Sequence, residues 1–427
     1  MPAYAERPRA ELEELKAGLE EEYAGYKALG LALDMSRGKP ASAQLDLSLP
    51  MLDLLGADAG FKSADGTDCR NYGLVDGLPE AKALMAVLLD DAAENTIVFG
   101  NASLTIMYDT VARCMAFGTL GSTPWGKLDE VKWLCPVPGY DRHFSVTETF
   151  GITMLNVPMN DDGPDMDMVE SLVGDGAVKG IWCVPKYSNP EGITYSDEVV
   201  RRLAAMECAA GDFRVFWDNA YCVHHLYDDA ARQDVVYDIG EACRDAGNAN
   251  RYFKFASTSK VTFPGGGISG FSASPDNIAE AKKYLAMQTI GHDKLNQLRH
   301  VRFLEDAAGI AAHMEKHAAI IRPKFELVLE KLEEGLGGTG CGAWKAPRGG
   351  YFISFDAPKG TAGRTVALAK EAGVVMTGAG ATYPYGKDPH DSNIRIAPTL
   401  PPLAELEAAM NIFTCCVKLA SVEKLLA

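Results

Sequence analysis

One lysine stands at the end of a strand-like run, in a setting that could form a Schiff base. Lys260 follows the string Phe255-Ala256-Ser257-Thr258-Ser259, and three glycines come shortly after it. A Schiff-base lysine needs a fixed, partly buried position, so that its amine is neutral and directed at a carbonyl. The hydroxyl groups of Ser257 and Ser259 would suit phosphate oxygens nearby. Most Ser-x-Ser-Lys strings lie in ordinary surface loops, so this segment alone does not decide the chemistry.

Two upstream segments place a carboxylate and an amide after apolar runs. Asp218 closes one run and is followed by Tyr221. Asn189 follows another run, in the string Asn-Pro-Glu-Gly. A carboxylate at the carboxyl end of a parallel strand could keep a pyridine nitrogen protonated, and the amide could donate to a phenolate oxygen. Taken singly, Asp218 also fits a capped turn and Asn189 a simple Asn-Pro turn.

The start of a predicted helix offers an anion site. Gly100-Asn101-Ala102-Ser103 ends a short apolar run, and a helical pattern covers Ala102–Phe117. Backbone N–H groups at a helix N-terminus attract anions such as phosphate.

The elements that carry these residues alternate between strand-like and helical patterns. Such alternation indicates an α/β fold, with a mostly parallel sheet covered by helices on both faces. We expect a large domain built on seven strands, at Ile97–Gly100, Val131–Pro136, Ile152–Val157, Val178–Pro185, Phe213–Asp218, Tyr252–Ser257 and Ile268–Ser274.

The remaining segments predict a second, smaller domain. A nearly continuous helical pattern covers residues 275–335, and short strands and helices follow it in an α+β arrangement. An acidic amphipathic helix over about residues 10–30 is expected to pack with this lobe. The predicted divisions are an N-terminal helix and arm at 1–48, a large domain at 49–305 and a small domain at 306–427.

Composition limits the partners. The formal net charge is −17, which disfavours nucleic acid and anionic membranes, and no apolar run approaches the length of a membrane span. The ten cysteines include no C-x-x-C pair, and the first sixteen residues lack the apolar core of a signal peptide. These features predict a cytoplasmic protein with reduced thiols.

Two further motifs resemble a metal site and a dinucleotide site but predict neither. His313 and His317 are four residues apart, but Glu315 is not placed as in a zinc-protease motif, so a solvated helix face is expected and no metal site is predicted. The glycines from Gly265 to Gly270 match G-x-G-x-x-G, but they lead into a strand and not a helix, which argues against a dinucleotide site.

Taken together, Asn189, Asp218, Tyr221 and Lys260 occur in the order and context found in one family. The chain resembles the fold-type-I, class I aminotransferases, which depend on pyridoxal 5'-phosphate (PLP). The strings Ser36-Arg37-Gly38-Lys39-Pro40 and Gln44-Leu45-Asp46-Leu47-Ser48 are similar to those of the aspartate aminotransferase subgroup related to the C-terminal domain of MocR-type regulators. The resemblance covers nearly the whole chain.

The resemblance implies a role for each matching residue. Lys260 would hold PLP as a Schiff base and transfer the proton, and Asp218 would pair with the pyridine nitrogen. Arg395 would grip the substrate α-carboxylate, with Gly38 against it and Arg37 nearby. Tyr72 would reach the phosphate from the partner subunit of a homodimer with shared active sites. The other cofactor contacts implied are Asn189 and Tyr221 at the phenolic oxygen, Tyr140 stacked on the ring, and Ala102, Ser103, Ser257 and Ser259 at the phosphate.

The chain departs from the family pattern at one position. Most class I members carry a phosphate-binding arginine eight residues after the lysine, and this chain has Ile268 there. Phosphate binding would have to rest on other groups.

The expected function is transfer of an amino group between an amino acid and a 2-oxo acid. The subgroup resemblance implies L-aspartate and 2-oxoglutarate, with Arg37, Lys39 and Arg142 as candidates to bind a second carboxylate. A different amino-acid specificity, a PLP-dependent β-lyase and a PLP-binding sensor domain remain alternatives, because they share the cofactor residues.

Overall fold

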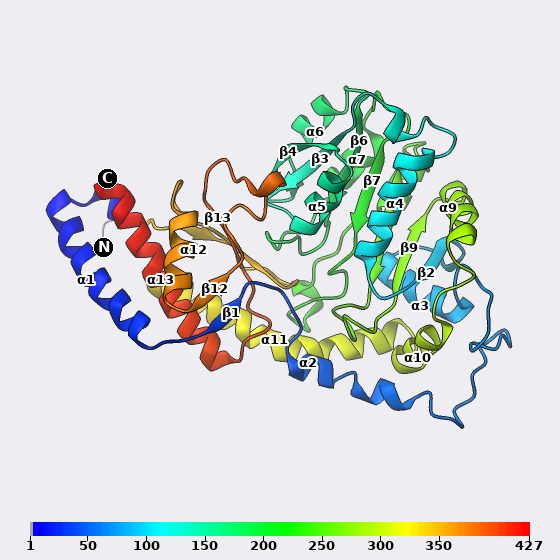
Figure 1. Ribbon diagram of the computed structural model, residues 1–427, viewed down its shortest axis with the longest axis horizontal. Helices are drawn as coiled ribbons and strands as arrows, with labels where there is room; N and C mark the ends of the chain where they lie inside the picture. Colours follow the sequence, from blue (N-terminus) through cyan, green and yellow to red (C-terminus); the bar gives the residue numbers. More distant parts are fainter. Residues whose placement is uncertain (1–2) are drawn as a thin grey trace.

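The computed structural model describes residues 3–427, which form two lobes (Figure 1). The large lobe contains an eight-stranded sheet, and the small lobe contains a three-stranded antiparallel sheet and a two-stranded parallel ribbon. One helix, α11 (Ala307–Leu336), runs from the large lobe into the small one. The α/β fold class predicted from the sequence is confirmed.

The large sheet has the strand order β2-β9-β8-β7-β6-β3-β4-β5, and neighbouring strands from β8 to β4 are parallel. β9 is antiparallel to both β2 and β8. Seven strands correspond to the predicted runs, and the eighth is a two-residue edge strand, β5. The bounds are β2 (Thr96–Phe99), β3 (Lys132–Val137), β4 (Thr153–Asn160), β5 (Gly163–Pro164), β6 (Val178–Cys183), β7 (Arg214–Asp218), β8 (Tyr252–Ser257) and β9 (Ser269–Ala273).

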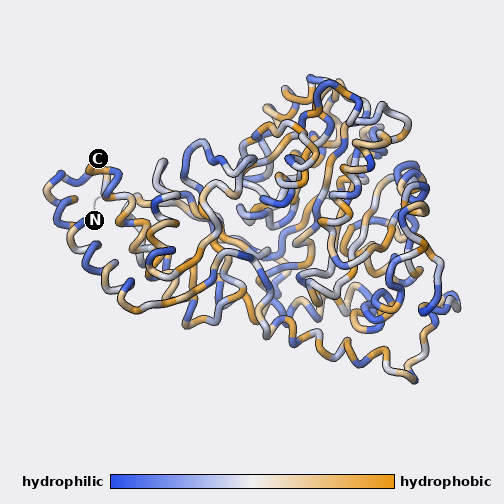
Figure 2. Tube along the Cα trace, in the orientation of Figure 1, coloured by the Kyte–Doolittle hydropathy of each residue, from blue (hydrophilic) through white to orange (hydrophobic). Residues whose placement is uncertain are grey.

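Helices cover both faces of this sheet, which explains why β6 and β7 are buried along their whole length. Side chains of α4, α5 and α9 pack on one face with Trp133 and Phe216. Side chains of α6, α7 and α8 pack on the other face with Leu134 and Val215. Figure 2 shows the hydrophobic runs along these strands. The helices of this lobe are α3 (Pro79–Leu89), α4 (Ser103–Phe117), α5 (Asp141–Thr149), α6 (Met166–Leu172), α7 (Asp197–Ala205), α8 (Ile239–Asp245), α9 (Pro275–Gln288) and α10 (Lys294–Leu304).

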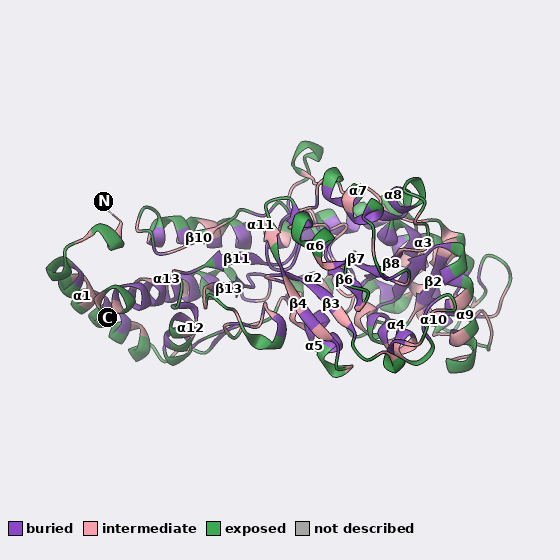
Figure 3. Ribbon diagram, turned by 90° about the horizontal axis from the view of Figure 1, so that it is seen from above, coloured by how far each residue is buried: buried purple, intermediate pink, exposed green. Residues whose placement is uncertain are grey.

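The small lobe joins the two ends of the chain. Leu12 and Leu19 of α1 are buried in one core cluster with Phe413 and Val417 of α13, and Figure 3 shows α13 largely buried. β1, which follows α1 in the N-terminal arm, pairs in parallel with β12. The elements are α1 (Arg9–Ala28), β1 (Leu33–Met35), α2 (Ser42–Asp46), β10 (Ala343–Trp344), β11 (Ile353–Asp356), α12 (Ala362–Glu371), β12 (Val374–Met376), β13 (Asn393–Ile396) and α13 (Leu403–Leu426).

The helical stretch predicted over 275–335 is three helices. Asp293 and Asp306 each cap the start of a new helix, by accepting from the backbone N–H of Asn296 and of Gly309. Six short 3-10 helices complete the secondary structure, at Tyr4–Glu6, Leu49–Asp53, Ala93–Asn95, Trp125–Lys127, Ala230–Arg232 and Pro384–Gly386.

The prediction that His313 and His317 lie on a solvated helix face is wrong. Both are buried, because α11 passes between the lobes and packs on both. The His313 Nε2 atom lies 2.7 Å from the Val261 carbonyl oxygen, and His317 Nδ1 lies 3.1 Å from Gln44 Nε2. The pair therefore ties the N-terminal arm to the segment that follows Lys260.

No helix within residues 3–427 is long and apolar enough to cross a membrane.

Candidate active site

The carboxyl ends of three adjacent parallel strands bring the predicted chemical groups to one edge of the sheet. Asp218 is the last residue of β7, and Lys260 comes three residues after the end of β8. Asn189 lies in the loop that follows β6. Because these strands are hydrogen-bonded neighbours, their C-terminal loops meet at one place, where open α/β sheets bind ligands.

Lys260 is positioned over an aromatic ring. Its Nζ atom lies 4.8 Å from the centroid of the Tyr221 ring. Burial lowers the pKa of the Lys260 amine, and the negative charge of Asp218 opposes this shift. A lowered pKa increases the neutral, nucleophilic fraction of the amine.

Asp218 offers an unused acceptor in a buried place. One carboxylate oxygen, Oδ2, lies 3.0 Å from Nε2 of His143, and the carboxylate is 2% exposed. The His143 ring is stacked on Trp182, with centroids 4.5 Å apart. The other oxygen, Oδ1, is buried and has no hydrogen-bond partner among the described residues. A buried carboxylate oxygen without a donor is costly, so this atom fits a ligand N–H such as that of a pyridinium ring.

Two tyrosines keep their phenolic protons. Burial, followed by the charge of Asp218, raises the pKa of Tyr140 to about 12. Burial raises the pKa of Tyr221 well above its ordinary value. Tyr140 directly precedes α5, and its ring lies edge-on to His143 at 4.9 Å. Both phenols can therefore donate hydrogen bonds at neutral pH.

The start of α4 lies beside the turn that carries Lys260. Ala102 is the N-cap residue of this 15-residue helix, and it has no side chain that could occupy the first N–H groups. Ser259 Oγ donates to the carbonyl oxygen of Asn101 at 3.1 Å, and Ser257 Oγ lies 3.0 Å from Ser259 Oγ. Ser103 is the first helical residue. These amides and hydroxyls form a cradle that fits a phosphate group.

Ile268 contributes no charge to this cradle. Its side chain is 1% exposed and packs in a core cluster with Leu78 and Leu298. Its backbone N–H donates to Thr258 Oγ1 at 2.9 Å.

Arg395, on β13 of the small lobe, faces the same edge of the large sheet. Its Nη1 atom donates to Asp141 Oδ1 at 3.1 Å and to Asn189 Oδ1 at 3.3 Å. The guanidinium lies 4.8 Å from the centroid of the Phe352 ring, and its Nε atom is buried and has no hydrogen-bond partner among residues 3–427. A buried guanidinium with a free donor suits a carboxylate ligand.

Gly38 packs against the ring that supports Arg395. A Cβ atom at Gly38 would lie 2.5 Å from Cζ of Phe352. Arg37, its neighbour, is exposed in the loop between β1 and α2.

The side chain of Tyr72 lies in solvent. Its side chain is 80% exposed, and within residues 3–427 it forms no hydrogen bond or ring contact.

The sequence reasoning did not single out His143 or Phe352. His143 lies three residues after Tyr140, so its position at the start of a helix was a signal that it faces the same site. Phe352 directly precedes β11, and β11 pairs with β13, the strand that carries Arg395.

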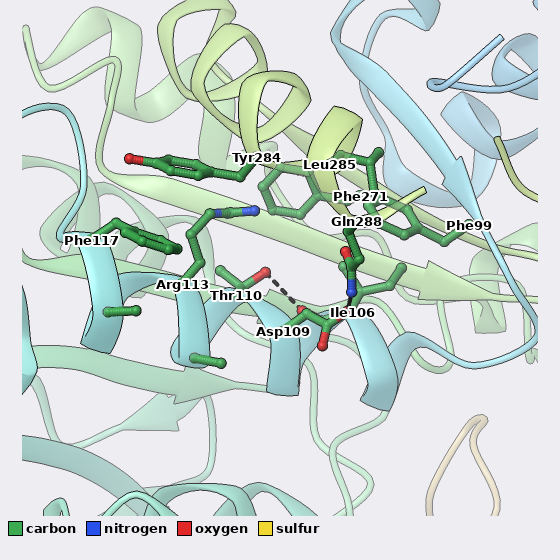
Figure 4. Close-up of a pocket in the computed structure, with 12 residues that line it drawn as sticks. Phe99, Ile106, Asp109, Thr110, Arg113, Phe117, Phe271, Tyr284, Leu285 and Gln288 are labelled. Carbon is green, nitrogen blue, oxygen red and sulfur yellow. Dashed lines mark hydrogen bonds between the residues drawn. The ribbon is translucent and has the colours of Figure 1, made fainter. Parts of the chain in front are cut away.

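A separate pocket of about 290 Å³ lies between α4 and α9 (Figure 4). None of the predicted site residues lines it. Its lining residues are Phe99, Ile106, Asp109, Thr110, Ala112, Arg113, Ala116, Phe117, Phe271, Tyr284, Leu285 and Gln288.

Comparison with known proteins places this geometry in a family. Residues 8–427 match the family model of aspartate amino-transferase. An aspartate aminotransferase of Corynebacterium glutamicum is 50% identical over 398 residues, which cover 93% of this chain and 91% of that protein.

Solved structures agree with this match. A crystal structure of an aspartate transaminase from Corynebacterium glutamicum has a TM-score of 0.96 and 47% sequence identity, and covers 99% of each chain. The α-aminoadipate aminotransferase LysN of Thermus thermophilus, complexed with N-(5'-phosphopyridoxyl)-L-leucine, has a TM-score of 0.73 at 19% identity. It covers 95% of this chain and 98% of its own, and shares the fold.

Proposed function

The chain belongs to the aspartate aminotransferase family and is an aminotransferase, and on that premise we propose that it holds PLP on Lys260 and transfers the amino group of L-aspartate to 2-oxoglutarate. The identity of 50% to an aspartate aminotransferase supports this choice of substrates. The single observation that carries the cofactor assignment is the buried, unpartnered Oδ1 atom of Asp218, which lies at the same sheet edge as Lys260.

When bound, PLP supplies an electron sink through its protonated pyridine ring. Asp218 Oδ1 would accept a hydrogen bond from the ring nitrogen and so keep it protonated, while His143 contacts the other carboxylate oxygen. Asn189 and Tyr221 would donate to the phenolic oxygen, and Tyr140 would pack against the ring. The start of α4 with Ser257 and Ser259 holds the phosphate, as the cradle geometry supports.

Lys260 is the base at the reacting carbon. Its neutral amine would take the α-proton of the amino acid and then give that proton to the aldehyde-derived carbon of the cofactor, on the other side of the amino nitrogen. The lowered pKa of this amine supports the role, because a protonated lysine could not accept the proton.

Arg395 binds the substrate α-carboxylate through its guanidinium. In the structure its Nη1 atom contacts Asp141, so a substrate carboxylate would compete with that residue. Arg37, Lys39 and Arg142 are the candidates for the second carboxylate, and all three are exposed.

Several finer assignments belong to the same proposal. We place the chain in the MocR-related subgroup, on the strings at 36–40 and 44–48, and we keep the domain divisions 1–48, 49–305 and 306–427. We propose a homodimer in which Tyr72 reaches the phosphate of the partner subunit, which its exposure supports. A cytoplasmic location is supported by ten free cysteines.

The test is an assay of the purified protein with PLP and 2-oxoglutarate, in which L-aspartate is compared with L-alanine and L-phenylalanine. We expect oxaloacetate from L-aspartate, and we expect Lys260→Ala to lower kcat by roughly 10⁴-fold while the fold is kept, because the base and the cofactor attachment are both lost.

Three outcomes would contradict parts of this proposal. Equal rates with alanine or phenylalanine would overturn the dicarboxylate specificity. Pyruvate released without a 2-oxo acid would indicate a β-lyase. Full activity of Lys260→Ala would overturn the role of Lys260.

A further inference from the structure

The phosphate cradle described above contains no cationic side chain. The start of α4, Ser257 and Ser259 supply only neutral donors, and Ile268 is buried in the core. A phosphate carries close to two negative charges at neutral pH, and neutral donors bind it less strongly than a guanidinium does. The cradle therefore needs a cation from another element.

Arg299 of α10 lies against the loop Gly265–Gly267 that follows Lys260, called the glycine loop below. Its Nη2 atom is 3.8 Å from the place that a Cβ atom would take at Gly266. Asn296, one turn earlier in the same helix, donates to the carbonyl oxygen of Gly267 at 2.8 Å and accepts from Arg299 Nη2. The helix is thus fixed to the loop at the point where the guanidinium lies.

The same loop touches the cradle on its other side. A Cβ atom at Gly267 would lie 3.5 Å from the carbonyl oxygen of Asn101, which also accepts from Ser259 Oγ. The side-chain amide of Asn101 donates to the carbonyl oxygen of Pro264 at 3.1 Å. Gly266 therefore lies beside Arg299, and the next residue, Gly267, lies beside the residue before the N-cap of α4; glycines leave room for a guanidinium to approach.

Arg299 has an N–H group without a hydrogen-bond acceptor within residues 3–427. It forms no ion pair within residues 3–427, and its Nε atom is buried without a hydrogen-bond partner. Arg302, in the same helix, differs: its guanidinium donates to the carbonyl oxygens of Ala59 and Gly60. An unpaired guanidinium with a buried free N–H points to an anionic ligand.

We propose that Arg299 binds the phosphate of the cofactor and replaces the arginine that other class I members carry at the position of Ile268. This assignment rests on the proposed function, because it takes the cradle as the PLP phosphate site. The charge comes from a helix that packs on the glycine loop and not from the strand that follows the loop.

The test compares PLP with pyridoxal, which has the same aldehyde but no phosphate. Dissociation constants are measured by absorbance and tryptophan fluorescence on cofactor-free wild type, Arg299→Gln, Arg299→Lys and the control Lys283→Gln, an exposed lysine on α9. We expect Arg299→Gln to weaken PLP binding roughly ten- to hundredfold and pyridoxal binding by less than about twofold. Arg299→Lys should fall between wild type and Arg299→Gln, and Lys283→Gln should match wild type.

The outcomes separate this assignment from the proposed function. Equal weakening of PLP and pyridoxal in Arg299→Gln would show a purely structural role and overturn the assignment, as would unchanged PLP binding. Wild-type protein that binds neither compound would overturn the proposed function itself. A normal thermal midpoint of Arg299→Lys keeps the comparison valid if Arg299→Gln folds poorly.

Discussion

At the scale of single residues, the site depends on two ionisable groups held out of water, Lys260 and Asp218. Asp218 ends the buried strand β7 and Lys260 follows the end of β8 by three residues, and the carboxylate partly offsets the effect of burial on the lysine amine. Because burial is the larger effect, the pKa of Lys260 in the folded, cofactor-free protein lies below its value in the unfolded chain.

This shift predicts how stability changes with pH. At pH values between the folded pKa and the unfolded pKa of about 10.4, the unfolded chain binds more protons than the folded protein does. Burial of Lys260 therefore lowers the free energy of unfolding at low pH, and this destabilisation disappears as the pH rises above the unfolded pKa. We expect Lys260→Met to stabilise the cofactor-free protein more at about pH 7.5 than at about pH 10.5. Urea unfolding at both pH values measures this, with Lys283→Met as the control. A stabilisation by Lys260→Met that is larger at the higher pH would contradict the predicted direction of the pKa shift.

At the scale of elements, the carboxylate site is built from three segments distant in the sequence. The loop after β1 brings Gly38 to the ring of Phe352, and Arg395 lies on the adjacent strand β13. A side chain at Gly38 would push the ring and therefore the guanidinium.

Gly38→Ala should accordingly impair substrate binding more than cofactor binding. Overpacking of about 1–3 kcal/mol corresponds to a rise in the KM for L-aspartate of roughly 5- to 150-fold. The dissociation constant of PLP should stay within about twofold. Steady-state kinetics measure the first quantity, and Gly25→Ala is the control because a Cβ there meets nothing within 4 Å. An unchanged KM would show that the ring moves freely.

The sequence predicted the site best where neighbouring strands end at one edge. Lys260, Asp218 and Asn189 follow adjacent parallel strands, so their meeting follows from the topology. The contact of His143 with Asp218 was not predictable in this way, because it depends on how α5 is rotated on the sheet. The burial of His317 was missed because helical spacing alone does not show that two lobes pack on one helix.

At the scale of the whole molecule, the proposed homodimer rests on the exposed ring of Tyr72. Nothing within residues 3–427 engages this side chain, although it precedes a loop that packs near α10. In a two-fold dimer each subunit would lend its Tyr72 to the site of the other.

Hybrid dimers test this arrangement. Tyr72→Ala and Lys260→Ala each damage both sites of their own homodimer, but in a hybrid one site keeps both native residues. At PLP concentrations where both parents are inactive, random mixing of unfolded subunits followed by refolding should restore about one quarter of wild-type activity. Activity no higher than the mean of the two parents would place Tyr72 in the site of its own subunit.

The pairing of the two chain ends has a consequence for synthesis on the ribosome. Residues 9–35 leave the ribosome before the large sheet is made, yet α1 packs on α13 and β1 pairs with β12, which are translated after that sheet. The strands of the large sheet and the helices that cover it lie between residues 79 and 288, so they can fold before the partner of α1 has been made. The small lobe can close only once α13 has left the ribosome, and until then the many acidic side chains of α1 oppose its aggregation.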